Sequence, residues 1–241
     1  MYGWRGRIGL VVPTGNSVME PEFHRMAPEG VTTHANRIYL KDVTPDSLAE
    51  MEQETARAAA GIATVRVGVI CFGCTSGSFV GGPGYDDKLI RIMEDETGVQ
   101  STTTTSSVMR ALASLNVSRI ALAAPYTDDV VQLEVDYLQA AGYEVTNWKG
   151  GGLVMTADIQ ECAPEVSYAR AVEVDSDRAE AVFISCTGFR AIDHLARLEA
   201  DLGKPVFSSN QASFADCLNM LGVGDVQPGF GSLFERMRRP G

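Results

Sequence analysis

The chain contains one short pattern twice, as Val69-Ile-Cys-Phe-Gly-Cys-Thr-Ser-Gly-Ser78 and as Ala181-Val-Phe-Ile-Ser-Cys-Thr-Gly188. Each copy begins as a run of apolar residues that is short enough to be a buried strand, and the small polar residues after it open a loop. Each copy therefore places a cysteine, Cys74 or Cys186, at the carboxyl end of a strand. In open α/β sheets, ligands bind at that end of the strands.

Other landmarks repeat along the chain at nearly the same interval. Arg7-Ile-Gly-Leu-Val-Val-Pro13 matches Arg119-Ile-Ala-Leu-Ala-Ala-Pro125 at an offset of 119 − 7 = 112, and the two cysteines have the same offset, 186 − 74 = 112. Gly98 and Gly203 open a third matching pair at an offset of 203 − 98 = 105. This order of repeats indicates an internal duplication. Two halves related by a pseudo-two-fold axis are expected to bring Cys74 and Cys186 together across one cleft.

The remaining pattern is an alternation of strands and helices. Strands are predicted at residues 7–12, 31–40, 99–102, 120–124, 144–147 and 206–208, besides the two cysteine strands. Helices are predicted at residues 18–26, 45–62, 85–96, 106–115, 164–178, 190–202 and 211–221, and from Thr127 to Gly142. Residues 77–84 are predicted to be a glycine-rich loop, and residues 148–162 give no clear prediction. Such alternation predicts an α/β fold in which helices cover both faces of a parallel sheet.

The domain prediction follows from the duplication. We expect two pseudo-symmetric, doubly wound halves, residues 1–117 and 118–241, with the active site in the cleft between them and the last helix free to pack back on the first half. No low-complexity linker separates the halves.

Composition excludes several classes of function. The 241 residues are 45% hydrophobic, and 20 basic against 31 acidic residues give a net charge of −11. A nucleic-acid partner is not expected, because such partners need a basic surface. No apolar stretch is long enough to cross a membrane, and the start of the chain has no signal-peptide pattern. We therefore expect a cytoplasmic protein.

The five cysteines do not indicate a disulfide framework, because their number is odd and no secretion signal is present. Cys71 and Cys74 form a C-x-x-C pattern, which also occurs in redox motifs and zinc sites. Cys71 falls inside the predicted strand, however, and no second Cys or His pair with suitable spacing is present to complete a zinc site. Cys71, Cys162 and Cys217 are interpreted as packing or surface residues.

A pair of cysteines in one cleft can perform acid–base and nucleophilic chemistry without a metal or organic cofactor. A thiolate is a nucleophile and a base once backbone N–H groups lower its pKa, and the small residues after each cysteine favour turns rich in such groups. One cysteine can take a proton from a carbon while the other returns one, or one can add to a double bond while the other protonates the next carbon. No glycine fingerprint for a nucleotide is present, because Gly81-Gly-Pro-Gly84 lacks the required spacing.

Other polar residues have structural as well as functional interpretations. Asn16 and Tyr126 each follow the proline that ends the first strand of their half, so symmetry places both near the cleft. Asn16 could also cap a helix, and Tyr126 could be a packing residue. His194 is interpreted as a surface residue, and Asp128 and Asp129 as residues that begin a helix.

On these motifs the chain resembles the aspartate/glutamate racemase superfamily, in the branch that contains maleate cis-trans isomerase, arylmalonate decarboxylase and an ectoine-utilisation protein. The resemblance covers nearly the whole chain. It rests on Arg7-Ile-Gly-Leu-Val-Val-Pro13, Gly73-Cys-Thr-Ser76, Ile184-Ser-Cys-Thr187, Gly203-Lys-Pro-Val206 and Ser209-Asn-Gln-Ala212. Arylmalonate decarboxylases have Gly at the first cysteine position, so the presence of both Cys74 and Cys186 favours an isomerase or racemase.

Resemblance to maleate isomerases implies the roles of the site residues. Cys74 would add to an alkene carbon and Cys186 would protonate the next carbon. Asn16, with the N–H groups of Thr75 and Ser76, would hold one carboxylate of a small dicarboxylic acid. Tyr126, with the N–H groups of Thr187 and Gly188, would hold the other. Oligomers, dimers or tetramers, are also implied by the resemblance.

One position departs from the maleate isomerase pattern. Alignment places Asp158 where those enzymes have an Asn that binds the second carboxylate, and an acid there would repel a dicarboxylate. An amino-acid racemase or an ectoine-utilisation type of enzyme therefore remains an alternative. A non-catalytic protein that binds a small ligand, with both cysteines as packing residues, is the alternative of another class.

Overall fold

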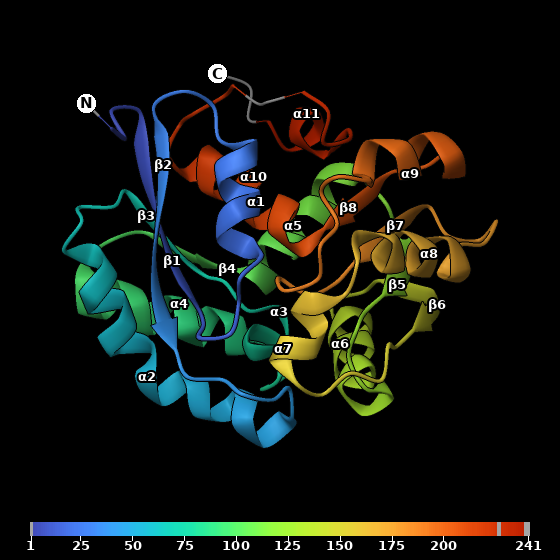
Figure 1. Cartoon of the computed structure of the whole chain (residues 1–241), viewed down its shortest axis with the longest axis horizontal. Helices are drawn as coiled ribbons and strands as arrows, with labels where there is room; N and C mark the ends of the chain where they lie inside the picture. The colour runs from blue at the N-terminus through green and yellow to red at the C-terminus, as the bar shows by residue number, and fades with distance from the viewer. Residues whose placement is uncertain (1, 226–227, 239–241) are drawn as a thin grey trace.

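The structure is a computed structural model that describes residues 2–225 and 228–238, and it contains two four-stranded parallel sheets (Figure 1). The first sheet consists, in spatial order, of β2 (Val31–Ile38), β1 (Gly6–Pro13), β3 (Val69–Phe72) and β4 (Ser101–Thr103). The second consists of β6 (Glu144–Lys149), β5 (Arg119–Ala123), β7 (Ala181–Ile184) and β8 (Val206–Ser208). The strand order is the same in both, so the predicted fold of two equivalent α/β halves is confirmed.

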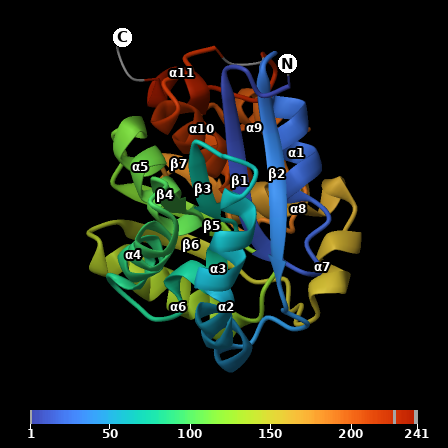
Figure 2. The same ribbon diagram turned by 90° about the vertical axis from the view of Figure 1, so that its left-hand side faces the viewer.

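Helices cover the sheets on both faces (Figures 1 and 2). Between the strands of the first sheet, and after its last strand, lie α1 (Met19–Met26), α2 (Pro45–Ala63), α3 (Thr75–Phe79), α4 (Tyr85–Thr97) and α5 (Thr104–Leu115). The rest of the chain forms α6 (Asp128–Ala140), α7 (Thr156–Glu161), α8 (Pro164–Val174), α9 (Leu195–Leu202), α10 (Ser209–Met220) and α11 (Leu233–Met237).

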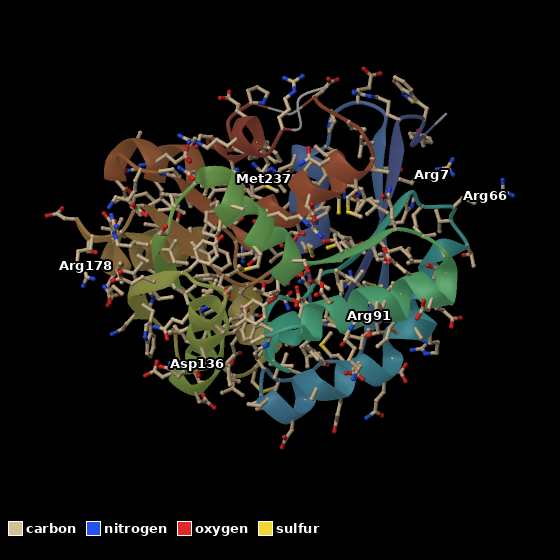
Figure 3. The ribbon with its side chains drawn as sticks, turned by 180° about the vertical axis from the view of Figure 1, so that it is seen from behind. Arg7, Arg66, Arg91, Asp136, Arg178 and Met237 are labelled. Carbon is tan, nitrogen blue, oxygen red and sulfur yellow. The ribbon has the colours of Figure 1, made fainter. Side chains whose placement is uncertain are left out.

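Figure 3 shows the charged side chains of Arg66 and Arg178 at opposite edges of the molecule.

The two cysteine strands run through the middle of their sheets. Every residue of β3 and of β7 is buried. Strands covered on both faces need apolar residues at every position, which explains why their sequences do not alternate between apolar and polar residues. This burial fixes the ends of β3 and β7, and so fixes where the two cysteines emerge.

Helix α10 belongs to the second half in sequence but packs mainly on the first. It contacts α1, α5, β3 and β4 of the first half as well as β8. Its buried Asp216 accepts hydrogen bonds from Thr102 Oγ1 at 2.8 Å and Ser107 Oγ at 2.9 Å, and forms an ion pair with Arg110. Both halves therefore share one continuous core. The division at residue 117 stays a prediction.

Two loop regions differ from the sequence-based prediction. The predicted loop 77–84 overlaps α3, whose first turn is capped because the Gly77 N–H donates to Cys74 Sγ at 3.3 Å. The predicted helix 190–202 begins only at Leu195. Bonds to other elements hold the preceding segment outside a helix, since Ser167 Oγ donates to the Arg190 carbonyl and the Ala191 N–H donates to Glu22 Oε1.

Boundaries elsewhere are close to prediction, with two additions. The helix predicted for residues 164–178 ends at Val174, and the unassigned stretch 148–162 contains the end of β6 and all of α7. Among residues 2–225 and 228–238, no helix is long and apolar enough to cross a bilayer.

Candidate active site

Cys74 and Cys186 lie at the carboxyl ends of β3 and β7 and line the same pocket. The pocket takes residues from both halves, as the duplication predicts. The predicted site residues that line it are Asn16, Cys74, Thr75, Ser76, Tyr126, Cys186, Thr187 and Gly188.

Cys74 has an ordinary extended backbone and stands at the N-cap of α3, with φ −144°. Its Sγ accepts a hydrogen bond from the Gly77 N–H at 3.3 Å, and Ser76 Oγ lies 3.8 Å away. Burial raises the pKa of the Cys74 thiol to about 11, although these two donors act in the opposite direction. The backbone N–H groups at the start of a helix have no intrahelical acceptor, so those of Thr75 and Ser76 are available to an anion, whereas that of Gly77 is bonded to Cys74 Sγ.

Cys186 has a strained backbone, with φ +100°. Its N–H donates to Ser209 Oγ at 3.0 Å, and its Sγ accepts from the Gly188 N–H at 3.3 Å. Burial raises the pKa of the Cys186 thiol to about 12, a hydrogen bond from the Tyr126 hydroxyl opposes this, and the nearby Cys74 adds to it. Cys74 is therefore close enough to affect the ionisation of the Cys186 thiol.

Tyr126 follows β5 and is buried, and its hydroxyl lies near Cys186. Burial, and after it the proximity of Cys186, raises the pKa of this hydroxyl well above its ordinary value. Tyr126 is thus a neutral hydrogen-bond donor in the pocket.

Hydrogen bonds between the halves hold the two cysteine loops together. Asn16 Nδ2 donates to Thr187 Oγ1 at 2.9 Å, and Thr187 Oγ1 donates to the Gly73 carbonyl at 3.1 Å. Thr75 Oγ1 donates to Ser209 Oγ at 2.9 Å, the same oxygen that accepts from the Cys186 N–H. Each threonine after a cysteine therefore joins its own loop to an element of the other half.

Asn16 combines the two interpretations that its sequence position allows. Its Oδ1 accepts from the Val18 and Met19 N–H groups, both at 3.0 Å, so it binds backbone groups at the start of α1, whose N-cap position is Val18. Its amide nitrogen makes the bond to Thr187, and one amide hydrogen remains for a ligand in the pocket.

Asp158 does not line the pocket, so the structure does not support its prediction as a substrate-binding residue. Asp158 is exposed on α7, whereas Thr156, Ile159 and Gln160 line the pocket. The physical reason is the helical period, because residues 156, 159 and 160 share one face of α7 and residue 158 lies on another. No helix was assigned to this stretch, so the face could not be chosen from the sequence.

Further lining residues, also missed from the sequence, form an apolar wall. Leu40 and Val43, just beyond β2, line the pocket together with Pro13 and Ile159. Gln160 Oε1 accepts from the Ser17 hydroxyl at 2.8 Å, so α7 is attached to the first half. No specific signal in the sequence pointed to Leu40 and Val43, because Leu40 ends the second predicted strand and Val43 lies in a mostly polar segment before Pro45.

The pocket has no cationic side chain among the residues that line it in the described part of the chain. An anionic ligand would therefore be held by backbone N–H groups, hydroxyls and the Asn16 amide. Within residues 2–225 and 228–238, no cluster of His, Cys, Asp and Glu side chains is arranged to hold a metal ion. His194 precedes α9, outside the pocket, with its ring edge-on to Tyr168.

Comparison with known proteins gives consistent matches over nearly the full length. The sequence model of the arylmalonate decarboxylase family matches residues 8–234. Maleate isomerase of Pseudomonas putida is 27% identical over 240 residues, covering 94% of this chain and 96% of that protein. Arylmalonate decarboxylase of Bordetella bronchiseptica is 28% identical over 232 residues, covering 95% of this chain and 96% of that protein.

A solved structure is also similar in fold. It is the maleate cis-trans isomerase of Nocardia farcinica, as a cysteine-to-serine mutant with a covalently bound succinylcysteine intermediate. It matches with a TM-score of 0.90 at 25% identity, covering 98% of this chain and 99% of that chain.

Proposed function

This chain belongs to the arylmalonate decarboxylase family, and on that premise we propose that it is a cofactor-independent cis-trans isomerase of the maleate isomerase type. The observation that carries the proposal is the pair of buried cysteines, one from each half, that line a single pocket. The maleate isomerase of N. farcinica, which holds a succinylcysteine, supports a covalent route through one of them.

Before the first step, Cys74 has released its proton to solvent and is a thiolate. In the first step, the thiolate sulfur adds to one alkene carbon of the bound diacid. The electron pair of the double bond moves to the neighbouring carbon and its carboxylate. Cys186 then gives its proton to that carbon, which leaves a succinyl group on Cys74 and a thiolate at Cys186.

In the second step, the former double bond is a single bond, so its two carbons can rotate. Cys186 takes a proton back from the neighbouring carbon, the double bond re-forms, and the Cys74 thiolate leaves. The product is the trans diacid, and both cysteines return to their starting states. Neither electrons nor atoms are gained or lost, so the reaction needs no redox partner.

The two carboxylates are bound by neutral donors. We propose that the Asn16 amide with the N–H groups of Thr75 and Ser76 holds one, and that Tyr126 with those of Thr187 and Gly188 holds the other. Hydrogen bonds of this kind to an anion are stronger than those between neutral groups. They replace the arginine or lysine that the pocket lining lacks.

The exposed position of Asp158 favours a dicarboxylate over an amino-acid substrate. The argument for an amino group on the substrate was repulsion from that acid, and Asp158 does not line the pocket. A racemase or an ectoine-utilisation type of activity therefore loses its particular support. The non-catalytic alternative is opposed by the pairing of two thiols in one pocket, since packing alone requires neither.

Proton NMR in deuterated buffer tests the proposal directly. The protein is incubated with maleate, alongside Cys74→Ala and Cys186→Ala, and fumarate is followed over time. We expect fumarate from the wild-type protein only. If maleate is unchanged, amino acids and diamino acids are supplied next. Deuterium at their α-carbon that depends on both cysteines would replace the proposal with a racemase, and no exchange with any of them would favour a binding protein.

We also propose a cytoplasmic homo-oligomer, a dimer or tetramer, that acts on a small carboxylate without a nucleic-acid partner. The net charge of −11 supports the last point. Light scattering on the purified protein measures the oligomeric state, and a monomer would contradict it.

A further inference from the structure

Two buried glutamates occupy equivalent positions in the two halves. Glu22 lies on α1 and Glu134 on α6, and their offset, 134 − 22 = 112, equals that of the two cysteines. Their exposed fractions are 5% and 3%. Figure 3 shows the contrast with Asp136, which is two residues further along α6 and projects from the outer side of the molecule.

Both carboxyl groups hydrogen-bond to the loop that carries Cys186. Glu134 Oε1 accepts from the hydroxyl of Ser185, the residue before Cys186, at 2.7 Å. Glu22 Oε1 accepts from the Ala191 N–H at 3.2 Å, and Glu22 Oε2 accepts from Asn210 Nδ2 at 2.7 Å. Asn210 Nδ2 also donates to the Thr187 carbonyl at 3.0 Å. The loop is therefore held just before and just after Cys186.

The loop that carries Cys74 has no such bonds. Among the residues that the structure describes, neither carboxyl group hydrogen-bonds to residues 73–79. Thr105, the counterpart of Asn210 at the offset 210 − 105 = 105, donates to the Thr75 carbonyl at 3.3 Å but makes no bond to Glu134. Glu134 Oε2 is consequently buried without a partner. The symmetry of the sequence is thus not matched by symmetry of the bonds.

The loop with these bonds is also the one with the unusual backbone. Cys186 has φ +100°, a region that residues other than glycine keep only when their surroundings fix it. Cys74, at φ −144°, needs no such support. Burying a carboxyl group is unfavourable, so two of them on one loop require an explanation.

We propose that Glu22 and Glu134 are positioning residues that hold Cys186 in this conformation and so direct its thiol towards Cys74. The proposal rests on the proposed function for its catalytic meaning, since a proton donor must face the carbon that the other sulfur attacks. Neither glutamate lines the pocket that contains the cysteines, so neither touches substrate.

The two glutamine variants are expected to differ, because Glu134 accepts hydrogen bonds with one carboxylate oxygen and Glu22 with both. Glu134 accepts one hydrogen bond, so Glu134→Gln can keep it, whereas Glu134→Leu cannot. Glu22 uses both oxygens, so Glu22→Gln presents an NH₂ group to one of its two donors and must lose that bond. Ser185→Ala removes the Glu134 bond from the other side, and it continues the test if the leucine variant does not fold.

Site-resolved alkylation tests the proposal without relying on turnover. The native variants are treated with iodoacetamide, and the rates at Cys74 and Cys186 are measured separately by mass spectrometry of peptides. We expect the Cys186 rate to rise at least about fivefold in Glu134→Leu, Ser185→Ala and Glu22→Gln, because the released loop exposes a thiol that is now buried. The Cys74 rate is expected to stay within about twofold.

Two controls complete the experiment. Glu134→Gln and Asp216→Asn should both leave the Cys186 rate within about twofold of wild type, since the first keeps its bond and the second alters a buried carboxyl group away from the cysteine loops. An unchanged Cys186 rate in the three test variants, or an equal rise at both cysteines, would overturn the proposal. Fumarate formation is measured in parallel, so inactivity of the wild type on maleate would count against the proposed function and not against this one.

Discussion

The loops after Cys74 and Cys186 occupy equivalent positions in the two halves but have different structures. After Cys74 the chain forms α3, and the sulfur accepts from the N–H three residues later. After Cys186 no helix forms, the backbone has φ +100°, and the sulfur accepts from the N–H two residues later. Tyr126 reaches Cys186, and its counterpart in the first half, at 126 − 112 = 14, is Thr14, which bonds to the Leu40 carbonyl.

This difference shows that a duplicated sequence can place two identical groups symmetrically and still give them different chemistry. An isomerase of the proposed kind needs one sulfur that attacks and one that carries a proton. The relaxed loop with helical N–H groups suits the attacking sulfur, and the strained loop with a tyrosine donor suits the proton carrier.

The largest expected effect comes from removing either sulfur. Cys74→Ala and Cys186→Ala should each lower kcat by about 10³-fold or more, because each abolishes one half of the two-step exchange. The serine variants of the two cysteines should differ in whether a covalent adduct with the substrate remains on the other cysteine. Cys186→Ser, treated with maleate, should retain a covalent adduct on Cys74, whereas Cys74→Ser should give none on Cys186. Intact-protein mass spectrometry followed by peptide mapping distinguishes them, and an adduct on Cys186 would reverse the assigned roles.

The next largest effect is expected in the pH dependence of kcat/KM. Because burial raises the pKa of Cys74 to about 11, the fraction of thiolate in the free enzyme grows as pH rises. We expect kcat/KM to increase up to about tenfold per pH unit between about pH 7 and 9. Cys186, with its pKa raised to about 12, stays protonated as the donor over this range, so no alkaline fall should appear there. A bell-shaped profile centred near neutrality would show that the cysteines do not differ in this way.

A further effect concerns stability and the two glutamates. Burial raises the pKa of Glu22 from 4.5 to about 7 and that of Glu134 from 4.5 to about 8. Between 4.5 and these values the folded protein holds protons that the unfolded chain has lost, so the free energy of unfolding falls as pH rises. Each group contributes about 1 kcal/mol per pH unit.

Urea unfolding at pH 5 and at pH 7 measures this slope, provided that unfolding is reversible. The glutamine of Glu134→Gln does not titrate, so the free energy of unfolding of this variant should fall less steeply with pH than that of the wild type. Above about pH 7, Glu134 should contribute more to the slope than Glu22, because its pKa is the higher of the two. Equal slopes in wild type and Glu134→Gln would mean that Glu134 is ionised in the folded protein.

The smallest expected effect compares glycine at the two cysteine positions. At residue 186, glycine relieves the strain of φ +100°, so Cys186→Gly should be more stable than Cys186→Ala by about 1 kcal/mol. At residue 74 the backbone is ordinary, and Cys74→Gly should be less stable than Cys74→Ala by about 0.5 kcal/mol. Alanine is the matched control at both sites, because it lacks sulfur but keeps Cβ. If the glycine variant were more stable than the alanine variant at both positions, or less stable at both, backbone strain at Cys186 would not explain the difference.

The sequence predicted the features that follow from repetition. The Cys-Thr motifs, their common offset and the apolar strands before them were enough to place Cys74 and Cys186 at equivalent strand ends in an α/β fold. A buried parallel strand has a strong signal, because it needs apolar residues on both faces. Asn16 and Tyr126 were found in the same way, from their place after each first strand.

The features that the sequence did not predict depend on tertiary contacts or on short helices. Helix α3 begins with a cap made by a cysteine sulfur, which is not among the usual capping groups. The face of α7 that lines the pocket contains Gln160 but not Asp158, and which residues lie on that face depends on where this six-residue helix starts. The equivalence of Glu22 and Glu134 was present in the numbering, but single acids on amphipathic helices are ordinarily solvated, so burial had to be seen.

The position of α10 has a consequence for how the protein is made. This helix completes the core of the first half, yet it spans Ser209–Met220, near the end of the chain. During synthesis, the first sheet emerges from the ribosome long before the helix that covers it. The N-terminal half is therefore expected to wait in an incomplete state until translation is nearly finished, and nascent chains arrested before residue 209 should be digested readily by protease where full-length chains resist.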